Sequence, residues 1–349
     1  MTMDFRLTDD QRALRAGMRE LLAARFPRER LRSLVDGDPL DGAGAVRELW
    51  RALGDAGLFA LRLPESDGGS GLGLPEAVLL FEETGRALLP GPLAATHLAA
   101  GLVPGAAEGH RLVTALDRPG PVAHLAQAAA VLLLDGATAR VLTPGEGEGP
   151  KALGAAPLRS VDPATPLHRV PHLPPPLGGS SLEVTADAGR LYGEATLLTA
   201  AQQLGSARRT VETAVAHARR RFQFGRPVGA FQAVQHLCAD MHVRAELARV
   251  SVYAASITAD PAEIAGAKLL ADSAAIRNAR DCLQVYGGLG FTWEADVHLH
   301  LKRAWIHAGQ WQSVAEGEEF LANRLLMSGP PETSSDVLAG GLDGGNVAL

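Results

Sequence analysis

Three long stretches in the second half of the chain constrain its fold more than any other feature. Residues 200–221, 231–258 and 261–286 each repeat apolar side chains with the 3.6-residue period of an α-helix. Few residues separate one stretch from the next, and Pro261 suits the first turn of a helix. Short connections place consecutive helices antiparallel and side by side. The sequence therefore predicts a bundle of long helices over residues 191–327.

The rest of the chain divides into three further zones. Residues 1–115 predict a helical domain, because Thr8 and Gln11 form a capping-box pattern and helical spacing recurs around Trp50 and over residues 74–89. Residues 116–190 hold short apolar runs between Gly and Pro, which is typical of a small β domain. Residues 328–349, rich in Gly, Ser and Asp, are expected to form a disordered tail. The predicted fold class is mainly α with a small central β domain.

Composition excludes several classes of protein. Hydrophobic residues make up 46% of the 349, too many for a disordered chain. The 33 basic and 39 acidic residues give a formal net charge of −6, which argues against a nucleic-acid surface. The two cysteines, Cys238 and Cys282, lie in helical stretches and form neither a disulfide framework nor a zinc site. We therefore expect a cytoplasmic protein.

Membrane and metal sites are not expected either. The longest uncharged apolar run, residues 87–107, is interrupted by prolines, so it does not predict a membrane-spanning helix. His298, His300 and His307 lack the i, i+4 spacing of a helical metal site, and we expect a solvated or interface cluster instead.

Two segments that end predicted helices allow two interpretations each. Residues 219–227, Arg-Arg-Arg-Phe-Gln-Phe-Gly-Arg-Pro, fit a basic helix end that complements the helix dipole and stops at Gly and Pro. They also fit a pyrophosphate site, in which Arg donates bidentate hydrogen bonds and Phe forms a flat apolar wall. Residues 284–291, Gln-Val-Tyr-Gly-Gly-Leu-Gly-Phe, fit either a helix C-cap or a loop that permits close backbone approach.

Taken in order along the chain, these segments resemble the acyl-CoA dehydrogenase family. Residues 50–58, Leu-Pro-Glu at 63–65, Asp-Gly-Gly-Ser-Gly at 67–71 and Glu-Glu-Thr-Gly-Arg at 82–86 are similar to its N-terminal helical domain. Residues 221–227, 231–236 and 239–241 are similar to its flavin segment, and residues 284–294 to its second C-terminal signature. The resemblance covers about residues 3–327 and is weakest in the middle.

The resemblance implies a fold, an activity and a set of site residues. It implies an N-terminal helical domain, a reduced β domain and a C-terminal four-helix bundle, with FAD-dependent α,β-dehydrogenation of an acyl-CoA thioester. An electron-transfer flavoprotein is the implied electron acceptor. Arg221 would contact the FAD pyrophosphate of a neighbouring subunit, so the fold implies an oligomer. The other implied FAD contacts are Gln223, Phe224, Val228 and Phe231 along the cofactor, and Gln284, Gly287 and Gly288 near its adenosine half.

The chain departs from the family pattern where the catalytic base belongs. Counting from Gly287 places the usual base glutamate on Trp311, and the base position of another branch on Ser273. Neither side chain can remove a proton from carbon, and the adjacent Asp272 points about 100° away on a helix. Thr196 stands where some members carry an arginine near the thioester.

The β domain also lacks the Thr-Glu-Pro flavin strand of the family and its Gly-Ser-Asp continuation. We therefore expect a subunit that works with a related chain, which supplies the catalytic glutamate and most of the flavin contacts. The alternatives are a self-sufficient homo-oligomer with Asp272 or Glu294 as a displaced base, a non-catalytic structural subunit, and, more remotely, a flavin oxygenase that reuses the pocket.

Overall fold

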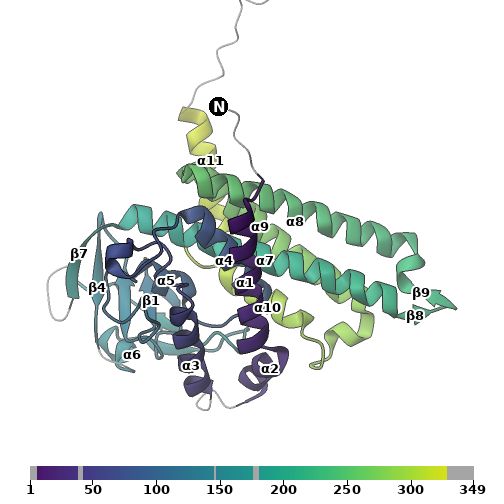
Figure 1. Cartoon of the computed structure of the whole chain (residues 1–349), viewed down its shortest axis with the longest axis horizontal. Helices are drawn as coiled ribbons and strands as arrows, with labels where there is room; N and C mark the ends of the chain where they lie inside the picture. The colour runs from purple at the N-terminus through teal and green to yellow at the C-terminus, as the bar shows by residue number, and fades with distance from the viewer. Residues whose placement is uncertain (1–5, 38–41, 145–146, 176–180, 328–349) are drawn as a thin grey trace, which may run out of the picture.

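The computed structural model describes residues 6–37, 42–144, 147–175 and 181–327. The tail predicted at residues 328–349 lies outside the described residues. Long helices form one part of the molecule, small sheets lie at one end of them, and shorter N-terminal helices pack along their side (Figure 1).

The predicted bundle is present. Helices α7 (Ala188–Arg220), α8 (Gln232–Thr258) and α9 (Pro261–Tyr286) run side by side, and α10 (Val297–Ala308) and α11 (Val314–Met327) pack against them (Figure 1). Helix α7 begins at Ala188 because Asp187 caps it, with its Oδ1 accepting from the N–H of Arg190 at 3.0 Å. Asp260 caps α9 in the same way, and Pro261 occupies the first turn, as expected.

The N-terminal helices are α1 (Asp9–Arg25), α2 (Arg28–Asp36), α3 (Gly42–Asp55), α4 (Leu74–Arg86) and α5 (Leu93–Leu98). The capping box predicted at α1 is confirmed, since Thr8 and Gln11 exchange two hydrogen bonds of 3.1 Å. The backbones of helices α4 and α7 touch where the two helices cross. A Cβ on Gly85 would lie 1.9 Å from the carbonyl oxygen of Gln202, and one on Gly205 would lie 1.8 Å from that of Glu82. This crossing therefore requires both glycines.

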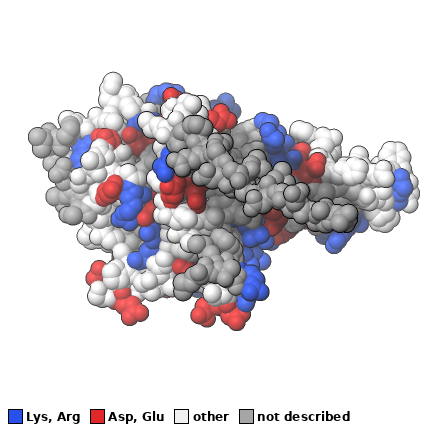
Figure 2. Space-filling view, turned by 90° about the horizontal axis from the view of Figure 1, so that it is seen from above, with Lys and Arg blue, Asp and Glu red and all other residues white. Residues whose placement is uncertain are grey.

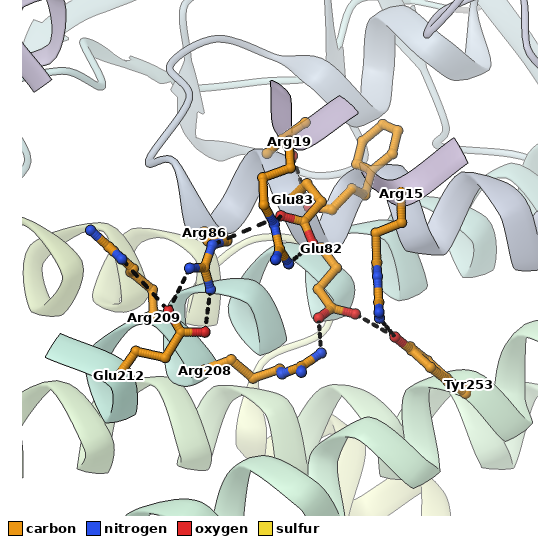
Figure 3. A network of polar contacts seen from close by, with 11 residues as sticks. Arg15, Arg19, Glu82, Glu83, Arg86, Arg208, Arg209, Glu212 and Tyr253 are labelled. Atoms are coloured by element: carbon orange, nitrogen blue, oxygen red, sulfur yellow. Dashed lines mark hydrogen bonds and ion pairs between the residues drawn. The ribbon is translucent and has the colours of Figure 1, made fainter. Parts of the chain in front are cut away.

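A polar network fixes the N-terminal helices on the bundle (Figure 3). The buried carboxylate of Glu83 accepts two hydrogen bonds from Arg19 of α1, at 2.6 and 2.8 Å. The neighbouring buried carboxylate, Glu82, accepts one from the hydroxyl of Tyr253 on α8 at 2.6 Å and forms an ion pair with Arg208 on α7. Each buried charge thus has partners, and four helices are held in one arrangement.

The strands form two small sheets and a separate hairpin. The four-stranded sheet has the order β1 (Val113–Leu116), β3 (Ala130–Leu133), β4 (Thr138–Leu142), β7 (Ser181–Asp187), with only the β1–β3 pair parallel. The three-stranded sheet is antiparallel, in the order β2 (Gly120–Ala123), β6 (Leu167–Val170), β5 (Ala156–Leu158). The short helix α6 (Gly149–Ala152) lies between β4 and β5 in the chain.

Candidate functional site

A cavity of about 100 Å³, here called the inner cavity, lies where the β domain meets the bundle. Residues that follow β1, the start of α5, the middle of α7 and the end of α10 line it. Trp311, the position that counting assigned to the catalytic base, forms part of its wall. The indole N–H of Trp311 donates to the hydroxyl of Thr199 at 3.0 Å, and its ring meets Tyr192 edge-on at 6.2 Å.

Arg118 also lines the inner cavity. It follows β1, forms an ion pair with Glu316 of α11 and donates to the carbonyl oxygen of Trp311. Asp117 lines the same wall, 3.6 Å from Arg118, and burial raises the pKa of its carboxyl. These contacts join the β domain to the loop between α10 and α11.

The other positions considered for the base lie elsewhere. Asp272 is fully buried inside the bundle, 2.5 Å from Nζ of Lys268 and 2.8 Å from Nε2 of Gln203. It lines neither the inner cavity nor the larger cavity described below. Ser273 is half-buried on α9, and Glu294 is exposed beside the larger cavity described below.

The flavin-segment residues predicted from the sequence gather at the opposite end of α7. Strands β8 (Phe222–Gln223) and β9 (Arg226–Pro227) form a hairpin that projects beyond the helices (Figure 1). Arg221, Gln223 and Phe224 are exposed, and Val228 and Phe231 are half-buried at its base. Phe224 is 89% exposed and meets Phe231 edge-on at 6.1 Å. The side chains therefore face away from their own bundle.

The second predicted segment lies at the same end. The ring of Tyr286, the last residue of α9, stacks on His217 of α7 at 4.0 Å, which brings the two helix ends together. Gln284, Gly287 and Gly288 are all exposed. Gly287 has a φ of +60°, and a Cβ at Gly287 or Gly288 would meet no atom within 4 Å. We call the hairpin, the exposed arginines at 219–221 that precede it and these three residues the tip surface.

The tip surface carries positive charge that its own chain does not neutralise. Within the described residues, the guanidinium groups of Arg219, Arg220 and Arg221 form no ion pair with an acidic side chain. The narrow right-hand end of Figure 2 shows blue and white surface at the hairpin. Exposed Arg groups, flat Phe rings and glycine backbone open to solvent suit the diphosphate and adenosine of FAD. The tip surface therefore fits part of this cofactor.

A larger cavity of about 920 Å³ separates α1 and α2 from the ends of α7, α9 and α10. Arginines and carboxylates line it together: Arg19 with Glu83, Arg86 with Glu212 and Arg28 with Asp296. Its charges are thus largely paired within the chain. Among residues 6–327, where described, no group of His, Cys, Asp and Glu is arranged to hold a metal ion. Nor does any described helix combine the length and apolarity of a membrane crossing.

The sequence alone did not single out Arg118 or Asp117. The partners of Arg118, Glu316 and Trp311, lie almost two hundred positions further along the chain, so no local pattern marks the contact. The Asp-Arg-Pro-Gly run at residues 117–120 was the only available signal, since it stands where the family strand carries Thr-Glu-Pro.

Comparison with known proteins decides the family. The models of the acyl-CoA dehydrogenase N-terminal and C-terminal domains match residues 8–107 and 189–308, together more than half of the chain. The chain belongs to the acyl-CoA dehydrogenase family. This membership confirms the resemblance found in the sequence and the predicted fold class. Members of the family are FAD-dependent dehydrogenases of acyl-CoA thioesters.

Two mycobacterial relatives illustrate how much of a family member the chain represents. Acyl-CoA dehydrogenase IpdE2 of Mycobacterium tuberculosis is 35% identical over 273 residues, which are 75% of this chain and 81% of IpdE2. Acyl-CoA dehydrogenase FadE34 of the same organism is 35% identical over 326 residues. The match covers 85% of this chain but 45% of FadE34, so the chain spans about half of that relative.

Solved structures agree on the fold. One chain of the ChsE4-ChsE5 complex from M. tuberculosis superposes with a TM-score of 0.75 and 25% identity, over 93% of this chain and 99% of that one. The Tcur3481-Tcur3483 steroid ACAD superposes with a TM-score of 0.76 over 92% of this chain and 98% of that one. At 23% identity, this likeness shows the fold alone.

Proposed function

We propose that this chain is one subunit of an FAD-dependent acyl-CoA dehydrogenase, in which a related chain supplies the catalytic glutamate and most of the flavin contacts. Arg221 and residues 284–288 of this chain would hold the diphosphate and adenosine part of the FAD seated mainly in the partner. The contrast between the open cationic tip surface and an inner cavity that holds Trp311 at the base position carries this proposal.

The chemistry sets what the partner must provide. The α-proton of a thioester is weakly acidic, so its removal needs a desolvated carboxylate and a polarised carbonyl oxygen. FAD, when bound, supplies the hydride acceptor for the β-position. In this chain the base position holds Trp311, whose indole cannot accept a proton, and Arg118 lies across the cavity. The residues of this chain would therefore bind and orient the cofactor, and the proton would pass to the partner.

Two comparisons support an assembly of unlike chains. The region similar to this chain makes up 45% of FadE34, so more than half of that protein lies outside the match. ChsE4-ChsE5 is a complex. A single chain of double length and a two-chain complex are both arrangements that could complete a half-site. By family resemblance we further propose an acyl-CoA substrate and an electron-transfer flavoprotein as electron acceptor.

The outer face of α8 supports a protein partner independently. Val243, Leu247, Val250, Ala254 and Ile257 follow one another at alternating spacings of four and three, the pattern of a helix-packing seam. Val243, Leu247 and Val250 are 55, 56 and 59% exposed, although the opposite face of α8 is buried in the bundle. We call this row the α8 stripe. A stripe of this length on a lone chain leaves a continuous apolar face in water.

The experiment is to purify the full chain alone and together with a related, longer acyl-CoA dehydrogenase chain from the same organism, and to measure FAD content and acyl-CoA oxidation. We expect FAD and turnover only in the complex. In the complex, Arg221→Ala should weaken FAD binding at least about tenfold, since a charge-assisted hydrogen bond is lost. Arg277→Ala, an exposed arginine on α9 outside the tip surface, is the matched control and should leave FAD binding unchanged.

The alternatives predict other outcomes. Full FAD occupancy and turnover by the chain alone would overturn the proposal in favour of a self-sufficient homo-oligomer. A complex that forms but never contains flavin would instead indicate a purely structural subunit.

A further inference from the structure

The two segments of the tip surface end different helices, and an aromatic contact joins these helix ends. The ring of His217, in the last turn of α7, stacks on the ring of Tyr286, with centroids 4.0 Å apart and planes 20° from parallel. Each ring adjoins a segment that the proposed function uses. The N–H of Arg221 donates to the carbonyl oxygen of His217 at 2.9 Å, and Gly287 directly follows Tyr286. The stack therefore acts on both segments at once.

The loop after α9 is folded tightly onto Tyr286. It forms the 3₁₀ helix η3 (Gly287–Phe291). A Cβ on Gly290 would lie 2.8 Å from the carbonyl oxygen of Leu283 and 3.0 Å from Cβ of Tyr286. No side chain fits at these distances, so the glycine backbone lies directly on the end of α9. A displacement of Tyr286 would therefore displace residues 287–290 with it.

The hairpin is fixed to the end of α7 in a similar way. The N–H of Val228 donates to the carbonyl oxygen of Arg221 at 2.7 Å. A Cβ on Gly229 would lie 3.0 Å from the carbonyl oxygen of Ala218, so the hairpin base lies close to the backbone of α7. Each segment of the tip surface is thus held against its own helix. The spacing between the two segments is set at the helix ends, where the two rings stack.

The ring of His217 contributes a flat surface rather than a charge. Burial lowers the pKa of His217, and the charges of Arg221 and Arg220 act in the same direction. The imidazole is therefore neutral near pH 7 and adds no positive charge for a diphosphate. We infer that His217 is a positioning residue for FAD, whose ring, stacked on Tyr286, sets the spacing between Arg221 and residues 284–288. The inference rests on the proposed function, since both concern the tip surface.

The test measures the FAD dissociation constant of the purified complex by fluorescence titration of the flavin. His217→Ala should weaken FAD binding about three- to tenfold, the range that an aromatic pair contributes. His217→Phe keeps a flat neutral ring and should retain the natural affinity. His217→Leu fills the half-buried space without a flat ring and should bind FAD as weakly as His217→Ala. If the alanine variant does not assemble, the leucine variant decides. His110→Ala, at an exposed histidine outside the tip surface, is the control.

A double-variant cycle separates spacing from general packing. With Arg221→Ala already present, one of the two segments no longer holds the cofactor, so adding His217→Ala should weaken FAD binding by less than about twofold. Fully additive effects, natural affinity in His217→Leu, or a loss that His217→Phe shares would each overturn the inference. The proposed function fails by a different result, in which Arg221→Ala alone leaves FAD binding unchanged.

Discussion

At the scale of single residues, the Lys268–Asp272 pair illustrates how a candidate catalytic group can be structural. Both side chains are almost completely buried, 2.5 Å apart, and Lys268 also donates to the carbonyl oxygen of His307 at 3.1 Å. Asp272→Asn would leave the ammonium group buried without a counter-ion. We expect the free energy of unfolding to fall by about 3–5 kcal/mol, measured by urea denaturation.

The double variant Asp272→Asn with Lys268→Met provides the control for this prediction. It removes both charges, so it should recover most of the lost stability. A stable Asp272→Asn chain that binds FAD on its own but loses turnover would contradict the structural assignment and would favour the displaced base of the homo-oligomer alternative.

Four buried histidines give the chain a defined response to acid. Burial lowers the pKa values of His97 and His124 to about 4, and those of His300 and His307 to about 3, from 6.5 in the unfolded chain. Below pH 6.5 the unfolded state therefore binds more protons than the folded state. Stability is full above pH 6.5 and falls as the pH drops toward 4, by about 1.4 kcal/mol per pH unit for each histidine.

The measurement for this prediction is the free energy of unfolding between pH 7 and pH 5. His300→Gln should reduce the slope by about one proton, because the ring that resists protonation is gone. A slope that His300→Gln does not change would show that His300 already binds a proton in the folded state.

At the scale of elements, the hairpin at the tip combines a favourable and an unfavourable turn residue. Phe224 and Gly225 occupy its two-residue turn with φ values of +53° and +77°, which is the type I′ geometry. Glycine suits this conformation, but for phenylalanine it costs about 1–2 kcal/mol. A strained, 89% exposed aromatic ring is best explained by a contact with another molecule.

Phe224→Asn tests this explanation, since Asn-Gly is the preferred type I′ pair. We expect the thermal stability of the chain to stay equal or rise slightly, while FAD binding by the complex weakens several-fold. Fluorescence titration of the flavin measures the second effect. Improved stability with undiminished FAD affinity would show that Phe224 has no part in the cofactor site.

The elements differ in how far the sequence could predict them. Helices α8 and α9 were predictable because their apolar period spans them and Pro261 marks the first turn of α9. Helix α7 was predicted only from residue 200, although it begins at Ala188, where Asp187 caps it. Strand β7 was not predictable, because it depends on pairing with β4, some forty residues earlier in the chain. Counting placed Trp311 in the active region, but the ion pair beside it depends on Arg118 and Glu316, which only the fold brings together. Local patterns thus predict elements, and long-range contacts decide the site.

At the scale of the whole molecule, the α8 stripe and the tip surface belong to one arrangement, since α8 begins directly after the hairpin. A partner that covers the stripe can also bring its FAD to Arg221. The fold of the lone chain does not depend on the stripe, because these side chains already face water.

Leu247→Glu combined with Val250→Glu should therefore separate folding from assembly. Each position would lose about 1.5–3 kcal/mol of apolar burial in the complex, so we expect the affinity for the partner to fall at least about a hundredfold. The thermal unfolding of the lone chain should not change, and flavin should be lost with the partner. Leu270→Glu, at a 43% exposed position on α9 outside the stripe, is the matched control and should leave the complex intact. A complex that survives both glutamates would place the partner on another face and would leave the tip surface as the remaining argument for shared FAD.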